Sequence, residues 1–122
     1  MKVVFINNTN NDKANDLKLK IKTNLISFNK KLKEDRIILY NKYYSNCDYD
    51  IYIIFSNNID DLKASILNLK PNANIIIITD NLSSSYILDC IKVTPNVCYS
   101  KNDPIYLIQK IYSVGIISKM EV

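Results

Sequence analysis

Residues that could contact a ligand or take part in chemistry follow the apolar runs of this 122-residue chain. They are Asn7 with Asn8, Ser56 after Phe55, Thr79 with Asp80, and Ser100 with Lys101. The amide, hydroxyl and ammonium groups among them offer hydrogen bonds to a polar ligand. Asn7 and Asn8 have the shape of aspartates without the charge, so the acidic pair that often begins the chemistry of α/β proteins is missing from the first run.

Several kinds of active site lack their residues in this sequence. It contains no histidine, which excludes histidine acid–base catalysis, phosphohistidine transfer and the commonest metal ligand. Gly115 is the single glycine, which excludes glycine-rich phosphate loops. Cys47, Cys90 and Cys98 form no C-x-x-C motif, and we expect reduced thiols, two of them in the core. We therefore expect no enzyme, no cofactor and no bound metal.

The composition predicts one globular domain spanning residues 1–122, with 48% apolar and 23% charged residues. The net charge is +4, and seven lysines fall between residues 13 and 33. We expect these lysines on the solvated face of a helix rather than in a nucleic-acid site. No apolar stretch approaches the roughly 18 residues of a membrane span, and Lys2 leads into a strand rather than a signal peptide, so we expect a cytoplasmic protein.

Five apolar runs have the length of strands, at residues 3–6, 37–40, 51–55, 75–78 and 97–99. The runs IYIIF and IIII are continuous rather than alternating, as in parallel strands that are covered on both faces. Apolar residues at steps of three and four predict helices between the runs. These helices are expected over residues 14–32, 59–69, 84–91 and from 104 onward.

This alternation predicts an α/β fold with a doubly wound, five-stranded parallel sheet of the flavodoxin-like type. Residues 41–49, between the second and third strands, can hold one or two helical turns at most, so the second helix should be shortened. Ligands of such sheets bind beyond the carboxyl ends of the strands. The polar residues that follow the runs are therefore expected at one edge of the sheet.

In length and element order the whole chain resembles the receiver domain of two-component response regulators. In that family a short basic-apolar strand, here KVVFI, is followed by an acidic magnesium-binding pair, which aligns with Asn7 and Asn8. The phosphoacceptor aspartate of the family aligns with Phe55, at the end of DIYIIF. Its Thr or Ser and its lysine align with Thr79 and Lys101, which are 22 residues apart. The resemblance implies a degenerate receiver, or pseudo-receiver.

The lost residues are the ones that receiver chemistry needs. A carboxylate must attack the phosphoryl group and become an acyl phosphate, which Phe55 cannot do. Magnesium prefers anionic oxygens, whereas the amides of Asn7 and Asn8 are neutral and no third carboxylate is expected nearby. The switch aromatic of the family aligns with Cys98, with Tyr99 one position away, so the coupling of such an aromatic residue to the threonine is not expected here.

The resemblance implies a phosphorylation-independent regulatory domain of a signal-transduction or transcription-control protein that acts through protein–protein contact or dimerisation. Receivers commonly pair through their fourth helix, fifth strand and fifth helix, and Asp89 and Lys110 have charges suited to reciprocal pairing across a two-fold axis. We expect a protein partner or a homodimer, no membrane contact, and DNA contact only through an output domain elsewhere. The residues expected on this partner face are Ile87, Asp89, Lys92, Tyr99, Tyr106, Gln109 and Lys110.

The alternative is a small-molecule-binding flavodoxin-like domain. Tyr43, Tyr44 and Tyr49 would then stack on a flat ligand, whereas otherwise they cover the sheet edge beside the shortened helix. Against a flavin or nucleotide, NNTNND after the first strand is a helix-capping sequence and not a phosphate loop. A cysteine-based phosphotransferase comes third, because it needs a thiolate beside the first strand and none of the cysteines lies there.

Overall fold

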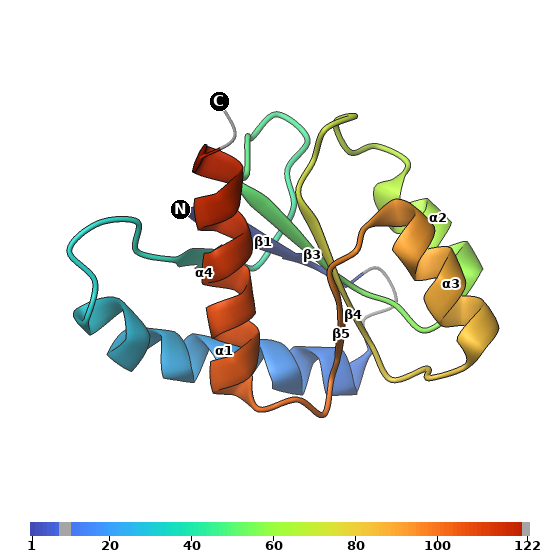
Figure 1. Ribbon diagram of the computed structural model, residues 1–122, viewed down its shortest axis with the longest axis horizontal. Coiled ribbons are helices and arrows are strands. Elements are labelled where there is room, and N and C mark those ends of the chain that lie inside the picture. The colour runs from blue at the N-terminus through green and yellow to red at the C-terminus, as the bar shows by residue number, and fades with distance from the viewer. Residues whose placement is uncertain (8–10, 121–122) are drawn as a thin grey trace.

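The structure is a computed structural model, and it describes residues 1–7 and 11–120. Strands and helices alternate along the chain except between the second and third strands (Figure 1). The strands are β1 (Lys2–Ile6), β2 (Ile38–Tyr40), β3 (Ile51–Phe55), β4 (Ile75–Thr79) and β5 (Val97–Tyr99). The helices are α1 (Asp12–Lys30), α2 (Ile59–Ile66), α3 (Ser84–Val93) and α4 (Pro104–Met120).

The strands form one parallel sheet in the order β2-β1-β3-β4-β5, which confirms the doubly wound, five-stranded fold expected from the sequence. The strand order reverses between β1 and β3, because the chain places β2 on one side of β1 and then β3, β4 and β5 on the opposite side of β1. Every residue of central β3 is buried, as its continuous apolar run predicts. The edge strands β2 and β5 are only three residues long.

Helices α1 and α4 cover one face of the sheet. The buried residues of α1 are Ala14, Leu17, Ile21 and Leu25, which is the apolar stripe read from the sequence. They pack in one core cluster with residues of α4 and with alternate residues of the central strands. The side chain of Asn11 accepts a hydrogen bond from the backbone of Lys13, so the asparagine-rich segment does cap this helix.

Helix α4 continues through Gly115, which therefore neither caps nor interrupts it. Gly115 is buried against the sheet, where a Cβ atom would meet the end of the Met1 side chain and, at 3.2 Å, the Cδ1 atom of Ile51. The glycine thus lets the helix lie close to the start of β1 and β3. This contact brings the amino-terminal strand beside the last turns of α4 (Figure 1).

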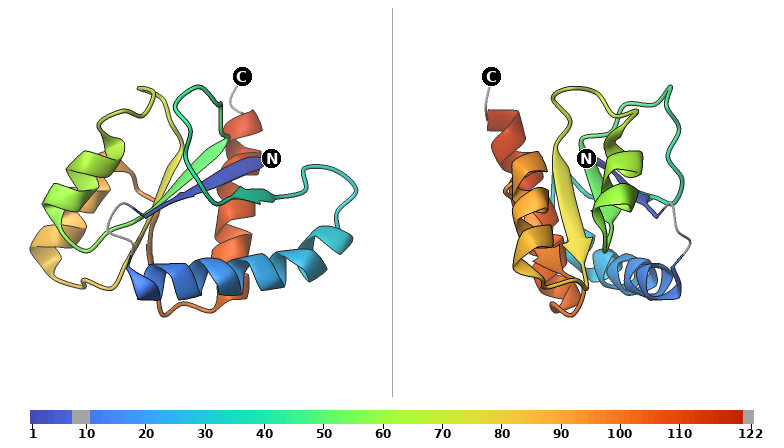
Figure 2. Two further views of the ribbon diagram at one scale, coloured as in Figure 1. Left: turned by 180° about the vertical axis from the view of Figure 1, so that it is seen from behind. Right: turned by 90° about the vertical axis from the view of Figure 1, so that its right-hand side faces the viewer.

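The second face is covered by the shorter helices α2 and α3 and by the connection from β2 to β3. Leu62 of α2 and Tyr86 and Cys90 of α3 pack on the sheet in a separate core cluster. The connection was expected to hold a shortened helix, but residues 41–50 form only turns and bends (Figure 2). The abbreviated crossover is confirmed, and its helical content is lower than expected.

Tyrosines lie where that helix is missing. Tyr49 packs edge-on against Tyr40 and Tyr52, with ring centroids 5.7 and 5.6 Å apart. The Tyr43 ring contacts the rings of Tyr49 and Tyr52, with centroids 5.9 and 6.1 Å away. Because Tyr43 and Tyr49 are packed on neighbouring rings, they serve as the cover of the sheet edge. Tyr44 lies outside this cluster, 52% exposed, with the Lys42 ammonium 5.5 Å from its ring.

Candidate functional site

The polar residues that follow β1, β3, β4 and β5 lie at the carboxyl edge of the sheet, as the parallel topology requires. We call this region, formed by Asn7, the segments 55–58 and 79–81, and Ser100 with Lys101, the carboxyl edge. Asn8 lies outside the described residues. The hydrogen bonds that each side chain makes here decide which groups are left for a ligand.

Thr79 is held in a closed hydrogen-bond network. Its side chain is fully buried, and its hydroxyl donates to Oδ1 of Asn57 at 3.0 Å and accepts from the backbone N–H of Asn81 at 2.9 Å. Oδ1 of Asn57 also accepts from the backbone N–H of Asp80 at 2.8 Å, and the Asn81 amide donates to the Asn57 carbonyl at 2.8 Å. Since a hydroxyl has one proton to donate, Thr79 has none left for a bound phosphate.

Phe55 and Ser56 are also turned into the protein. Phe55 is 3% exposed and belongs to the core beneath α1 and α4. Ser56 donates to the Asn58 carbonyl at 3.0 Å and accepts from the Tyr86 hydroxyl at 2.9 Å. Burial raises the pKa of Tyr86, which keeps this phenol protonated as a donor. Phe55, at the phosphoacceptor position, has no side-chain oxygen, and the hydroxyl oxygen of neighbouring Ser56 is not accessible.

Asn7 connects the end of β1 to the start of α1. Its amide nitrogen donates to the Asn11 carbonyl and to Oδ1 of Asn15, both at 3.3 Å. Its own Oδ1 accepts from the backbone N–H of Asn11 at 3.4 Å. An aspartate has no amide protons and could not make the first two bonds, so here asparagine has a structural use of its own.

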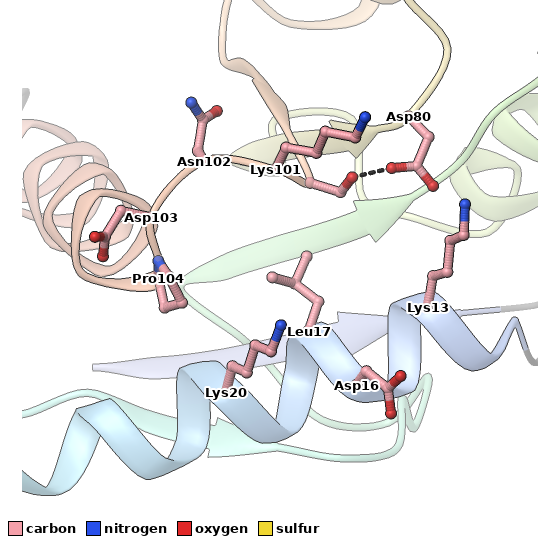
Figure 3. A pocket seen from close by; sticks show the side chains of 10 residues that line it. Lys13, Asp16, Leu17, Lys20, Asp80, Lys101, Asn102, Asp103 and Pro104 are labelled. Carbon is pink, nitrogen blue, oxygen red and sulfur yellow. Dashed lines mark hydrogen bonds between the residues drawn. The ribbon is translucent and has the colours of Figure 1, made fainter.

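One carboxylate does lie at the carboxyl edge, and the expectation that none would be near was wrong. Asp80 is half-buried and accepts a hydrogen bond from the Ser100 hydroxyl (Figure 3). The sequence already places Asp80 directly after the fourth apolar run, among the polar residues expected at this edge. Among the described residues no group of three His, Cys, Asp or Glu side chains is close enough to hold a metal ion.

A cleft opens beside Asp80, between the first turns of α1 and the loop from β5 to α4. Its volume is about 360 Å³. Lys101 is exposed and lines it, and so do Lys13 and Lys20 from the opposite wall (Figure 3). The remaining lining residues are Asp16, Leu17, Asp80, Ser100, Asn102, Asp103 and Pro104.

The expected partner face is divided in the structure. Asp89 and Lys92 form a 3.9 Å ion pair and line a groove beside α2. Ile87 and Ile91 lie on the other side of α3, because each is two positions from Asp89, which is a rotation of about 200° around a helix of 3.6 residues per turn. Asp89 therefore lies on the side of α3 that is turned toward α2.

The remaining residues of the expected face lie on β5 and α4. Tyr99 is 45% exposed and Tyr106 is 51% exposed, while Gln109 is exposed and Lys110 is half-buried. A small cleft of about 200 Å³ lies beside Tyr99, with Leu82 among its other lining residues. The sequence reasoning did not single out Leu82, which is 63% exposed in the loop after β4.

All three cysteines are free thiols, and Cys90 and Cys98 are buried as expected. Burial raises the pKa of both buried thiols, which opposes formation of the reactive thiolate. Cys47 is exposed in the connection between β2 and β3. None of them lies at the carboxyl edge.

Comparisons of the chain with protein-family models, with curated proteins and with solved structures found no significant match. Within the described residues, no helix is both long enough and apolar enough to cross a membrane.

Proposed function

We propose that this domain is a phosphorylation-independent regulatory module that resembles a receiver and acts in the cytoplasm through contact between protein surfaces. The observation that supports it is the closed network around Thr79, whose hydroxyl is used by Asn57 and Asn81. In a phosphorylated receiver a threonine at this place must be able to turn to a phosphoryl group. Phe55 lies in the core beside it, so in the described part of this edge the phosphoacceptor position offers no carboxylate and the threonine hydroxyl is already bonded.

The contact surface proposed is the side of the molecule around β5, and the partner is a second copy of the chain. Among the described strands β5 pairs with β4 alone, so its other edge has no strand partner. Large apolar side chains are exposed around it, and tyrosine is a frequent anchor of protein interfaces. They are Leu82, Ile91, Tyr99 and Tyr106, each at least 45% exposed.

Sedimentation velocity over a concentration series tests this proposal. We expect the wild-type chain to dimerise and the Tyr99→Ser/Tyr106→Ser variant to stay monomeric, because two anchors of the interface are removed. Leu67→Ser is the matched control, since Leu67 is 79% exposed at the end of α2, a helix that contributes none of these four side chains. It should dimerise as the wild type does.

The series is repeated with magnesium and beryllofluoride, which mimics a phosphorylated aspartate. The dimer should be unaffected, because Phe55 offers no carboxylate for the mimic. A chain that stays monomeric at every concentration, or that dimerises only with the mimic, would overturn the proposal.

A further inference from the structure

The outer side of α4 has no exposed charge over most of its length. The helix lies at one outer side of the molecule, in front of α1 and the sheet in Figure 1, so no described element covers it there (Figures 1 and 2). Between residues 104 and 118 every exposed residue of α4 is uncharged. Depletion of charged side chains is typical of the core of a protein interface. The outer side of α1 differs, since its exposed residues include Asp12, Lys13, Asp16, Lys20 and Lys30.

Most of the exposed residues of α4 form one stripe along the helix, which we call the outer stripe. Three of its side chains are large, and they are exposed by 51% at Tyr106, 54% at Ile117 and 77% at Met120. A helix that is apolar on its outer side as well as its inner side is usually covered on both. The members of the outer stripe are Tyr106, Gln109, Ser113, Ile117 and Met120. Ile117 and Met120 extend it beyond the partner face expected from the sequence.

The spacing of the outer stripe is that of a seam between two packed helices. It runs from residue 106 to residue 120 in steps of three, four, four and three residues. The average step is about 3.5 residues, which is the period of a coiled-coil seam. The order of the steps is the same from either end, with Ser113 in the middle. A two-fold axis beside Ser113 therefore places the stripe of one copy on the stripe of another, with the helices antiparallel.

The contacts of such a pair follow from this symmetry. Tyr106 lies opposite Met120 of the second copy, and a thioether packs favourably against an aromatic ring. Gln109 lies opposite Ile117 of the second copy. The two Ser113 side chains meet at the axis, where their small size lets the helices approach closely. Polar residues within a seam favour one register of pairing over others, which fits Gln109 and Ser113.

The charge of the chain favours a second copy as the occupant of this face. The net charge is +4, so two copies repel each other and approach most easily where exposed charge is absent. A strongly acidic partner would instead be attracted to the exposed lysines of α1. The outer stripe is also continuous with the surface around β5, because Tyr106 belongs to both.

We propose that two copies of the chain dimerise with their α4 helices packed antiparallel along the outer stripe, about a two-fold axis beside Ser113. This inference rests on the dimer proposed above and specifies which element lies at its centre. The surface around β5 then flanks the helix pair.

Disulfide formation between two copies tests the pairing. In a Cys47→Ser background, which removes the exposed thiol, Ser113→Cys places one new thiol beside the proposed axis. Packed helices lie about 8–10 Å apart, which brings the Cα atoms of the two residues 113 to about 5 Å, within the range of a disulfide. We expect mild oxidation to convert most of this variant into a covalent dimer on a non-reducing gel.

Gln109→Cys in the same background is the matched control, since Gln109 is also an exposed member of the outer stripe. In the proposed register the two residues 109 are separated by about 12 Å along the helices, which is too far for a disulfide. This variant should cross-link about tenfold more slowly or not at all. The double variant Gln109→Cys/Ile117→Cys should cross-link again, because the two positions lie opposite each other.

A charge placed at the axis gives a second measurement. Ser113→Arg should weaken dimerisation about tenfold or more in sedimentation velocity, because two cations then meet in the interface. Thr23→Arg adds the same charge at an exposed position of α1 and should dimerise within about twofold of the wild type. Thermal unfolding of each variant verifies that the substituted chains are folded.

The outcomes separate this inference from the proposed function. A dimer that does not cross-link through residue 113, or that cross-links equally fast through residue 109, would overturn the α4 pairing and leave the surface around β5 as the interface. Equal dimerisation of Ser113→Arg and Thr23→Arg would overturn the pairing in the same way. A wild-type chain that stays monomeric at every concentration would overturn both proposals.

Discussion

The two faces of the sheet are covered by different means. On one face, α1 with 19 residues and α4 with 17 residues form a continuous layer over the strands. On the other, α2 and α3 have only 8 and 10 residues, and the β2 side has no helix at all. There the cover is a loop that contributes aromatic rings, Tyr43 and Tyr49, to a cluster with Tyr40 and Tyr52.

The difference shows that a loop can substitute for a helix when its side chains are large and carry a polar end. The Tyr49 hydroxyl accepts from the backbone N–H of Tyr44 at 3.1 Å and donates to the Lys42 carbonyl at 3.3 Å. The Tyr43 hydroxyl donates to the Asn68 carbonyl at 3.3 Å. The rings thus bury apolar surface while the phenols satisfy backbone groups that a helix would have satisfied itself.

The largest effect is expected beneath the helical layer. Ile53 is fully buried in the core under α1 and α4, so Ile53→Ala should lower the free energy of unfolding by about 2–5 kcal/mol. Ile26→Ala is the control, because Ile26 is 63% exposed on α1 and its loss should change stability by about 0.5 kcal/mol or less. Urea unfolding measures both, and equal losses would contradict the assignment of the core.

A smaller loss of unfolding free energy is expected in the tyrosine cover, because the Tyr49 side chain is half-buried whereas that of Ile53 is fully buried. Tyr49→Ala removes two edge-on ring contacts and should cost about 1–3 kcal/mol. Tyr49→Phe keeps the rings packed and loses only the hydroxyl bonds, for about 0.5–1.5 kcal/mol. If Tyr49→Ala cost no more than Tyr49→Phe in urea unfolding, the rings would not be the cover.

The smallest effect is expected at the ion pair that ties the end of α4 to the loop before β2. The hydrogen bond from Lys119 lowers the pKa of Asp35 below its ordinary 3.8, and the same bond raises the pKa of Lys119 above its ordinary 10.5. The stabilisation by Asp35 is present above pH 3.8 and is lost as pH falls through its lowered pKa. The stabilisation by Lys119 is present below pH 10.5 and is lost as pH rises through its raised pKa.

Asp35→Asn should therefore lower the thermal midpoint slightly at neutral pH and not at either extreme of pH. Asparagine suits this test because Asp35 has φ 57°, a left-handed conformation that Asn also adopts readily. Thermal unfolding of both proteins across the pH range gives the difference. A difference that does not vary with pH would mean that the charge of Asp35 does not contribute.

The sequence placed the candidate site at the correct edge but did not predict its hydrogen bonds. Phe55, Thr79 and Lys101 do lie at the carboxyl edge because parallel strands end on the same side. Asn57 and Asn81, which bond the Thr79 hydroxyl, were missed, since asparagine after a strand is ordinary turn chemistry. A side-chain bond between Asn57 and Thr79, 22 residues apart, depends on how two loops lie beside each other.

The sequence by itself determined the strands, their parallel arrangement, and the amino-terminal cap and buried stripe of α1, because these follow from local periodicity and from the residues at element ends. Only the tertiary structure decided that tyrosines replace a helix beside β2 and that Asp89 lines a groove beside α2. The same holds for the three lysines that meet at one cleft. These features depend on side-chain directions in segments distant along the chain, and no local pattern specifies them.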